Sequence, residues 1–180
     1  MLQLDIEEQE FFDEAKNEFI HIEPQKLSFE HSLISLSKWE SKWHKPFLKP
    51  GDKKTQEESI DYIRCMCINK NVNPIVFWSL KQEQIDKLEA YIADPMTGTT
   101  ISNVTSRPSR QIMTSELFYY YMFSFNIPIE CEKWHLNRLV PLIEVFSIKN
   151  SPGKNMSKAD AMARNRQLNA ARRKKYNSKG

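Results

Sequence analysis

Three cysteines and a histidine are the residues of this chain whose types are most suited to metal or nucleophilic chemistry. Cys131 and His135 stand four residues apart in a predicted helix, which would place a thiolate and an imidazole on one face, and Cys65 and Cys67 could add two zinc ligands. However, two side chains two residues apart on a helix point about 200° away from each other, and no Cys-x-x-Cys or His pair occurs. We therefore predict no metal and no cofactor, and interpret the cysteines as buried apolar residues.

Catalytic arrangements are also incomplete. Cys131 and His135 lack a third residue that would orient the base, so His135 is better interpreted as a surface residue or as the partner of a buried carbonyl. The acidic runs at 7–10 and 13–14 flank two phenylalanines and are interpreted as solvated charge in an exposed loop or a short helix. The glycines are too scattered for a phosphate-binding loop, at positions 51, 98, 153 and 180. We do not expect an enzyme.

Composition indicates a globular protein that leans towards helix. The chain has 180 residues, of which 40% are hydrophobic and 27% charged, and its four glycines are few for a turn-rich all-β fold. An odd number of cysteines and an N-terminus without a signal-peptide pattern predict a reducing, cytoplasmic location. The longest apolar run, around 117–125, is too short to cross a bilayer, so no membrane association is expected.

Residues 1–30 are expected to form a small β element that packs on a helical body. Apolar and polar residues alternate at 2–7, 19–22 and 27–29, and residues 24–26 between the last two segments contain a proline that can turn the chain into a hairpin. The fold class is therefore predicted as mainly α with an N-terminal β element, that is, α+β.

The body, residues 31–149, is expected to consist of helices. Leu33, Leu36, Trp39 and Trp43 recur with helical spacing before a proline at 46 ends the pattern. Capping residues predict further helix starts at 55–58, 73–74, 79–82 and 114–116, with apolar faces that include 60, 63, 67 and 68 in one helix and 85, 88 and 92 in another. Residues 94–113 are predicted to be a loop or weak hairpin, and a last helix from 129 is predicted to be kinked or divided at Pro141.

Charge is distributed unevenly along the chain. Residues 151–180 contain nine Lys and Arg against one acid, a net charge of about +8, whereas residues 1–150 have a net charge of about −5. A linker at 150–154 and a capping box at 157–160 predict that residues 150–180 are a linker followed by a basic helix. The partner-binding candidates in this tail are Arg164, Arg166, Arg172, Arg173, Lys174 and Lys175.

Three interpretations of this basic tail remain open. It could bind the phosphates of nucleic acid, dock on an acidic protein surface such as the body of another copy, or act only as a solubilising terminus. Trp39, Trp43 and Trp134 are further candidates for partner binding, together with the tyrosines at 119–121, although large rings at helical spacing are more often core residues.

Several strings resemble a group of poorly characterised proteins of tailed bacteriophages and prophages. They are SLSKWESKWHKPFL at 35–48, YIADPMT at 91–97, IECEKWHLNRL at 129–139 and RNRQLNAARR at 164–173. The resemblance implies a chaperone-like role in tail assembly, or a minor structural role, through contacts with other phage structural proteins such as the tape measure or the tail tube. It also implies a location in the host cytoplasm during assembly, with retention in the virion left open, and it transfers no catalytic residue.

Overall fold

A computed structural model describes residues 1–13, 17–99, 111–150, 162, 165–170 and 172–173. The chain divides into two units, Met1–Ser147 and Ile148–Gly180. The strands of the first unit are β1 (Leu2–Ile6), β2 (Gln9–Asp13), β3 (Glu18–Ile22) and β4 (Gln25–Phe29). Its helices are α1 (Leu33–Trp43), α2 (Gln56–Met66), α3 (Ile75–Trp78), α4 (Gln82–Ala93), α5 (Ser115–Ser124), the 3₁₀ helix η1 (Ile129–Lys133) and α6 (Leu136–Asn150), whose last residues enter the second unit. The fold is α+β, as the sequence predicts.

The strands form one long antiparallel ribbon that is interrupted in the middle. β1 pairs with β4 and β2 pairs with β3, and the residue numbers of every pair add to the same value, so a single register runs through both halves. The predicted hairpin through Pro24 is therefore wrong. Pro24 instead lies in the interruption between β3 and β4, where its missing N–H breaks no ladder bond. We call β2 and β3 the β-arm.

The ribbon also corrects the interpretation of the acidic runs at 7–10 and 13–14 as parts of an exposed loop or a short helix. Residues 9–13 form strand β2 rather than an exposed loop or a short helix. Alternation explains this outcome, since Phe11 packs against the core while Phe12 faces solvent.

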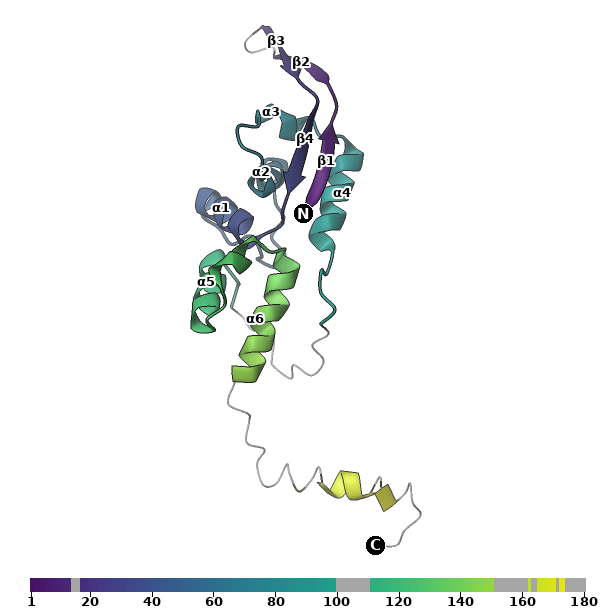
Figure 1. The fold of residues 1–180 in the computed structure, drawn as a ribbon, viewed down its shortest axis with the longest axis vertical. Coiled ribbons are helices and arrows are strands. Elements are labelled where there is room, and N and C mark those ends of the chain that lie inside the picture. The colour runs from purple at the N-terminus through teal and green to yellow at the C-terminus, as the bar shows by residue number, and fades with distance from the viewer. Residues whose placement is uncertain (14–16, 100–110, 151–161, 163–164, 171, 174–180) are drawn as a thin grey trace. The chain divides into compact units, whose positions relative to one another are not determined.

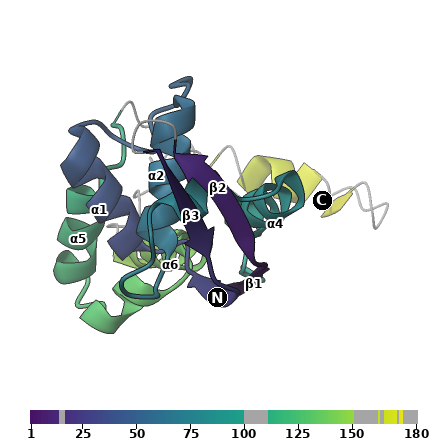
Figure 2. The same ribbon diagram turned by 90° about the horizontal axis from the view of Figure 1, so that it is seen from above.

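One hydrophobic cluster lies between the β1–β4 pair and the helices α2, α3 and α4. Its most buried members include Leu27, Phe29, Trp39, Met66 and Leu88. A second cluster joins α5, η1 and α6, and it includes Leu33 and Leu36 of α1. Helix α1 therefore contributes to both clusters, and Figures 1 and 2 show it beside α5.

Helix α2 begins as the sequence predicts but ends earlier. Thr55 and Glu58 form the reciprocal capping box, with each side chain accepting a hydrogen bond from the other residue's backbone N–H. The helix stops at Met66, so Cys67 and Ile68 do not extend its apolar face. These two residues run beside β4 instead. Cys67 forms an isolated antiparallel β-bridge with Phe29, and the N–H of Ile68 donates a hydrogen bond to the carbonyl of Ser28.

The capping box predicted at 79–82 is wrong, because Ser79 ends α3. Its hydroxyl donates to the carbonyl of Val76, and α4 begins two residues later than expected. The side chain that supports the start of α4 is Gln84, which accepts from the N–H of Lys81. Helix α3 begins at Ile75 with Pro74 as its N-cap, one residue later than predicted, and the Asn73 side chain accepts from the N–H of Ile75.

The predicted helix from 129 is divided, but not at the predicted residue. η1 ends at Lys133, and α6 begins at Leu136, so the break lies at Trp134–His135. Pro141 lies inside α6 without dividing it. The helix expected from the capping residues at 114–116 is confirmed as α5, which begins at Ser115 and ends at Ser124. Residues 94–99 and 111–114 form neither helix nor strand.

Candidate interaction surfaces

The cysteines do not assemble with His135 into a reactive group. Cys131 is buried in η1 and His135 lies in the break before α6, so the prediction that they share one helix face is wrong. Burial raises the pKa of all three thiols, which disfavours the reactive thiolate. Within the described residues, no cluster of three or more His, Cys, Asp or Glu side chains is arranged to hold a metal ion.

His135 is held by hydrogen bonds that define its tautomer. The N–H of Asn137 donates to Nδ1 at 3.2 Å, so Nδ1 carries a lone pair and the proton of a neutral ring is on Nε2. Nε2 then donates to the carbonyl of Tyr91 at 3.0 Å. The interpretation of His135 as the partner of a buried carbonyl is therefore confirmed.

A second histidine, His31, lies against the first. The ring centroids of His31 and His135 are 5.0 Å apart, and both side chains are buried. Nδ1 of His31 is 2.6 Å from the hydroxyl of Tyr62. Burial, followed by the nearby His135, lowers the pKa of His31 to about 4. Burial raises the pKa of Tyr62, so its hydroxyl stays protonated and can donate to His31.

These histidines lie where the two hydrophobic clusters meet. The N–H of Leu136 donates to the carbonyl of His31 at 2.6 Å, which ties the start of α6 to the end of the ribbon. On the same side, the Tyr91 hydroxyl donates to Glu30 at 2.6 Å, and the terminal ammonium of Met1 lies 3.0 Å from the other oxygen of Glu30. Every one of these bonds joins segments of this chain, so we interpret the group as a structural junction. The contact between His31 and His135 could not be predicted from the sequence, because no local pattern relates the two residues.

The three tryptophans that were candidates for partner binding differ in exposure. Trp39 has no exposed surface, and its Nε1 donates to the carbonyl of Glu58 at 2.8 Å, so it is a core residue and offers nothing to a partner. Trp43 is half-buried and donates to Asp61 at 2.9 Å. Trp134 is half-buried beneath the guanidinium of Arg138, 4.1 Å from the ring centroid. Only the last two present any ring surface.

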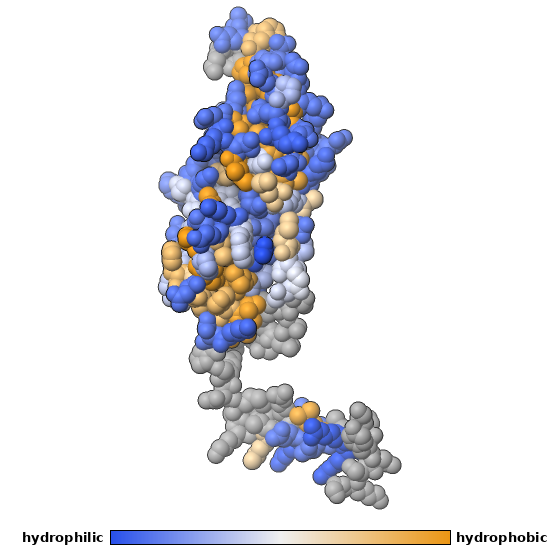
Figure 3. Space-filling model, in the orientation of Figure 1, coloured by the Kyte–Doolittle hydropathy of each residue, from blue (hydrophilic) through white to orange (hydrophobic). Residues whose placement is uncertain are grey.

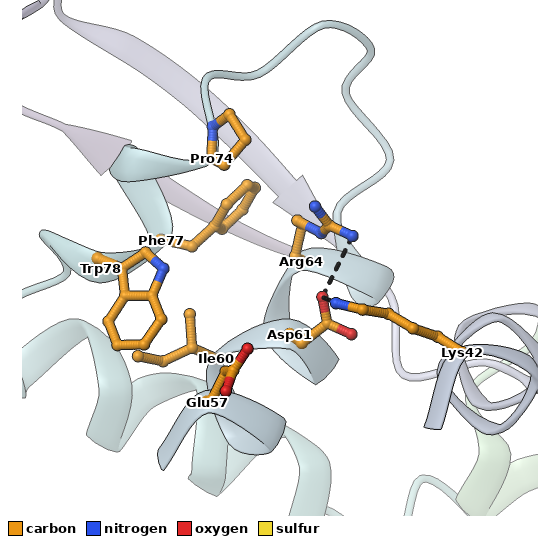
Figure 4. A pocket seen from close by; sticks show the side chains of 8 residues that line it. All are labelled: Lys42, Glu57, Ile60, Asp61, Arg64, Pro74, Phe77 and Trp78. Atoms are coloured by element: carbon orange, nitrogen blue, oxygen red, sulfur yellow. Dashed lines mark hydrogen bonds and ion pairs between the residues drawn. The ribbon is translucent and has the colours of Figure 1, made fainter. Parts of the chain in front are cut away.

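A small hollow lies between α2 and α3 (Figure 4). Its volume is about 120 Å³, and it is lined by Lys42, Glu57, Ile60, Asp61, Arg64, Pro74, Phe77 and Trp78. The buried carboxylate of Asp61 is 2.7 Å from Nζ of Lys42 and 3.2 Å from Nη2 of Arg64, while Trp78 forms the opposite wall. Because Lys42 and Arg64 are both paired with the carboxylate of Asp61, none of these three groups offers an unpaired charge to a ligand in the hollow.

Helix α5 carries two aromatic side chains that are mostly exposed. Tyr120 is 62% exposed and Phe123 is 65% exposed. Tyr119 stacks on Phe123 with 6.5 Å between ring centroids, one helical turn apart. We call Tyr119, Tyr120 and Phe123 the aromatic surface, and Figure 3 shows apolar side chains gathered over this helix. The tyrosines of this helix were predicted as candidates for partner binding, whereas Phe123 was not, although its spacing of four residues from Tyr119 is typical of one helix face.

In the second unit, the described part of the basic tail is helical and exposed. Arg166, Arg172 and Arg173 are among these residues, as are Met162 and Leu168, which are 64% and 45% exposed. The other tail candidates, Arg164, Lys174 and Lys175, and the predicted capping box at 157–160 lie outside the described residues.

Comparison with known proteins adds no relative. No protein-family model matches the chain, and neither curated proteins nor solved structures give a match. Among the described residues, no helix is long and apolar enough to cross a membrane.

Proposed function

We propose that this protein acts without catalysis, through protein–protein contacts, in the assembly of bacteriophage tails. Its partners are phage structural proteins, such as the tape measure or the tail tube, and it acts in the host cytoplasm during assembly. The observation that carries the proposal is the aromatic surface of α5, on which Tyr120 and Phe123 are each more than half exposed.

Such a surface suits an interface for physical reasons. Tyrosine and phenylalanine bury a large area with few rotatable bonds, and aromatic side chains are enriched in the cores of interfaces. The stacking of Tyr119 on Phe123 restricts both rings before binding, which reduces the entropy lost when a partner covers them. The phage assignment itself rests on the resemblance of the strings at 35–48, 91–97, 129–139 and 164–173.

Co-expression with phage tape-measure and tail-tube proteins tests this function. We expect a complex that survives purification at moderate ionic strength and that the double variant Tyr120→Ser/Phe123→Ser weakens at least tenfold, since truncating a central interface aromatic costs roughly 2 kcal/mol. Ile68→Ser is the matched control, because Ile68 is 54% exposed but lies beside β4. Absence of any complex with the wild-type chain would refute the tail-assembly role, and equal weakening by the control would refute the role of α5.

A second candidate function is the binding of nucleic acid by the tail. The observation in its favour is that Arg166, Arg172 and Arg173 are exposed on a helical segment of a strongly basic region. Such binding should weaken steeply with salt, because each phosphate contact releases counterions. Affinity for duplex and single-stranded DNA is to be measured between 50 and about 300 mM salt, with and without residues 157–180. An unchanged affinity after truncation excludes this function.

A further inference from the structure

The β-arm presents an unusual apolar pair to solvent. Phe12 of β2 and Phe19 of β3 are cross-strand partners whose ring centroids are 5.0 Å apart, and they are 49% and 68% exposed. On the other face of the arm, Phe11 and Ile22 pack against the first hydrophobic cluster. The arm is therefore anchored at its base while its phenylalanine pair is left uncovered.

The arm and the residues that flank it are also strongly acidic. Residues 7–23 contain seven Asp and Glu against a single Lys, a net charge of about −6. Glu10, Glu18 and Glu23 are exposed, and in the part of the chain that the structure describes no cation is paired with them. An occupant of this surface should therefore combine positive charge with a few apolar side chains.

The basic tail has this chemistry. Its described helical residues include exposed arginines at 166, 172 and 173 together with exposed Met162 and Leu168, in a region of net charge about +8. We propose that the basic C-terminal helix of one copy docks on the acidic β-arm of a second copy. The arginines face the arm's glutamates, and the apolar side chains of the helix cover Phe12 and Phe19.

Chain length favours a second copy over the same chain. Within the first unit, the ribbon and α6 leave the His31–His135 junction in opposite directions (Figure 1). At roughly 3.3 Å per strand residue and 1.5 Å per helical residue, Phe19 and Ser147 are about 60 Å apart. With residues 151–161 fully extended, the segment from Ser147 to Met162 spans about 45 Å, and a helix from Met162 to Arg172 adds about 15 Å. A tail therefore reaches the phenylalanine pair of its own arm only when its connection is fully stretched, whereas a flexible connection of that length has an end-to-end distance of about 20 Å. Docking on a second copy does not require this stretching.

Docking of this kind has a defined consequence for assembly. Each copy supplies one arm and one tail, so two copies that exchange tails form a closed two-fold dimer, and larger numbers form rings or open chains. Because the attraction is between exposed charges, association should weaken as salt rises. The contact does not use the aromatic surface of α5, so an experiment that refutes this contact does not refute the proposed function, and the reverse also holds.

Sedimentation velocity of the full chain at 50 and 500 mM NaCl tests the proposal. We expect association at low salt and monomer at high salt. The arm variant Glu10→Lys/Glu18→Lys/Glu23→Lys and the tail variant Arg166→Glu/Arg172→Glu/Arg173→Glu should each weaken association at least tenfold, and an equimolar mixture of the two variants should restore it.

Matched controls separate a specific contact from a change in net charge. Glu83→Lys/Glu89→Lys/Glu130→Lys makes the same change in charge on exposed positions outside the arm and should leave association intact. Circular dichroism confirms that each variant is folded, and Phe12→Thr/Phe19→Thr, which suits a strand, gives a second arm variant. A monomer at both salt concentrations, a compact monomer that expands with salt, equal loss in the control, or no restoration in the mixture would each overturn the proposal.

Discussion

Acidification is expected to destabilise this protein through His31. The imidazole is buried against His135 and accepts from the hydroxyl of Tyr62, and its pKa is lowered from 6.5 to about 4 in the folded chain. In the unfolded chain the pKa returns to about 6.5. Between these values the unfolded chain binds a proton that the folded chain does not, so stability is complete above pH 6.5 and is lost as the pH falls towards 4.

The magnitude follows from the difference between the two pKa values. At roughly 1.4 kcal/mol per pKa unit, the full loss is about 3 kcal/mol, reached below pH 4. At pH 5 the same linkage gives a loss of about 2 kcal/mol relative to pH 8. This is a large share of the total stability of about 5–15 kcal/mol that a domain usually has.

Urea denaturation at pH 5 and pH 8, followed by the fluorescence of the four tryptophans, measures this loss. His31→Asn keeps an acceptor for Tyr62 but does not titrate. The loss of stability between pH 8 and pH 5 should therefore be about 2 kcal/mol smaller in this variant than in the wild type. His44→Asn is the control, because His44 is exposed at the end of α1, where Asn tolerates its left-handed backbone. If wild type and His31→Asn lose equal stability, or if NMR shows that His31 titrates near 6.5, the reasoning is wrong.

Two further predictions concern hydrogen bonds that hold helix ends. Glu40 is buried, and its two carboxylate oxygens accept hydrogen bonds from the N–H groups of Phe47 and Ser115. Glu40→Ala should therefore lower the free energy of unfolding, measured by urea denaturation, by about 3 kcal/mol, and Glu40→Gln should lower it by less. Equal losses in the two variants would contradict this account. Thr55→Ala should cost about 1 kcal/mol in the same assay, because the N-terminal cap of α2 is lost, whereas Thr55→Ser should cost little.

Much of the fold could be predicted from local patterns. Apolar residues at helical spacing located α1, and the Thr55–Glu58 pair located the start of α2, because both depend on residues within a few positions of each other. The errors occur where a distant partner decides the outcome. Cys67 leaves the helical pattern to join β4, and β3 pairs with β2 instead of its neighbour across Pro24.

The candidate interaction residues also divide into those that local sequence patterns reveal and those that only tertiary packing decides. The exposed arginines of the tail at 166, 172 and 173 were visible in the sequence, since a basic segment with few large apolar residues cannot form its own core. The burial of Trp39 was not, because helical spacing is the same for a ring that faces the core and a ring that faces a partner.

The sequence by itself determined the α+β class, most helix starts and the contrast between an acidic body and a basic tail, because these follow from composition and from short-range periodicity. Only the tertiary structure decided that the strands form one ribbon with an exposed phenylalanine pair, and that His31 meets His135 at the junction of two hydrophobic clusters. The contact between His31 and His135 joins residues far apart in the chain, and it forms because packing both clusters brings the ends of β4 and η1 together.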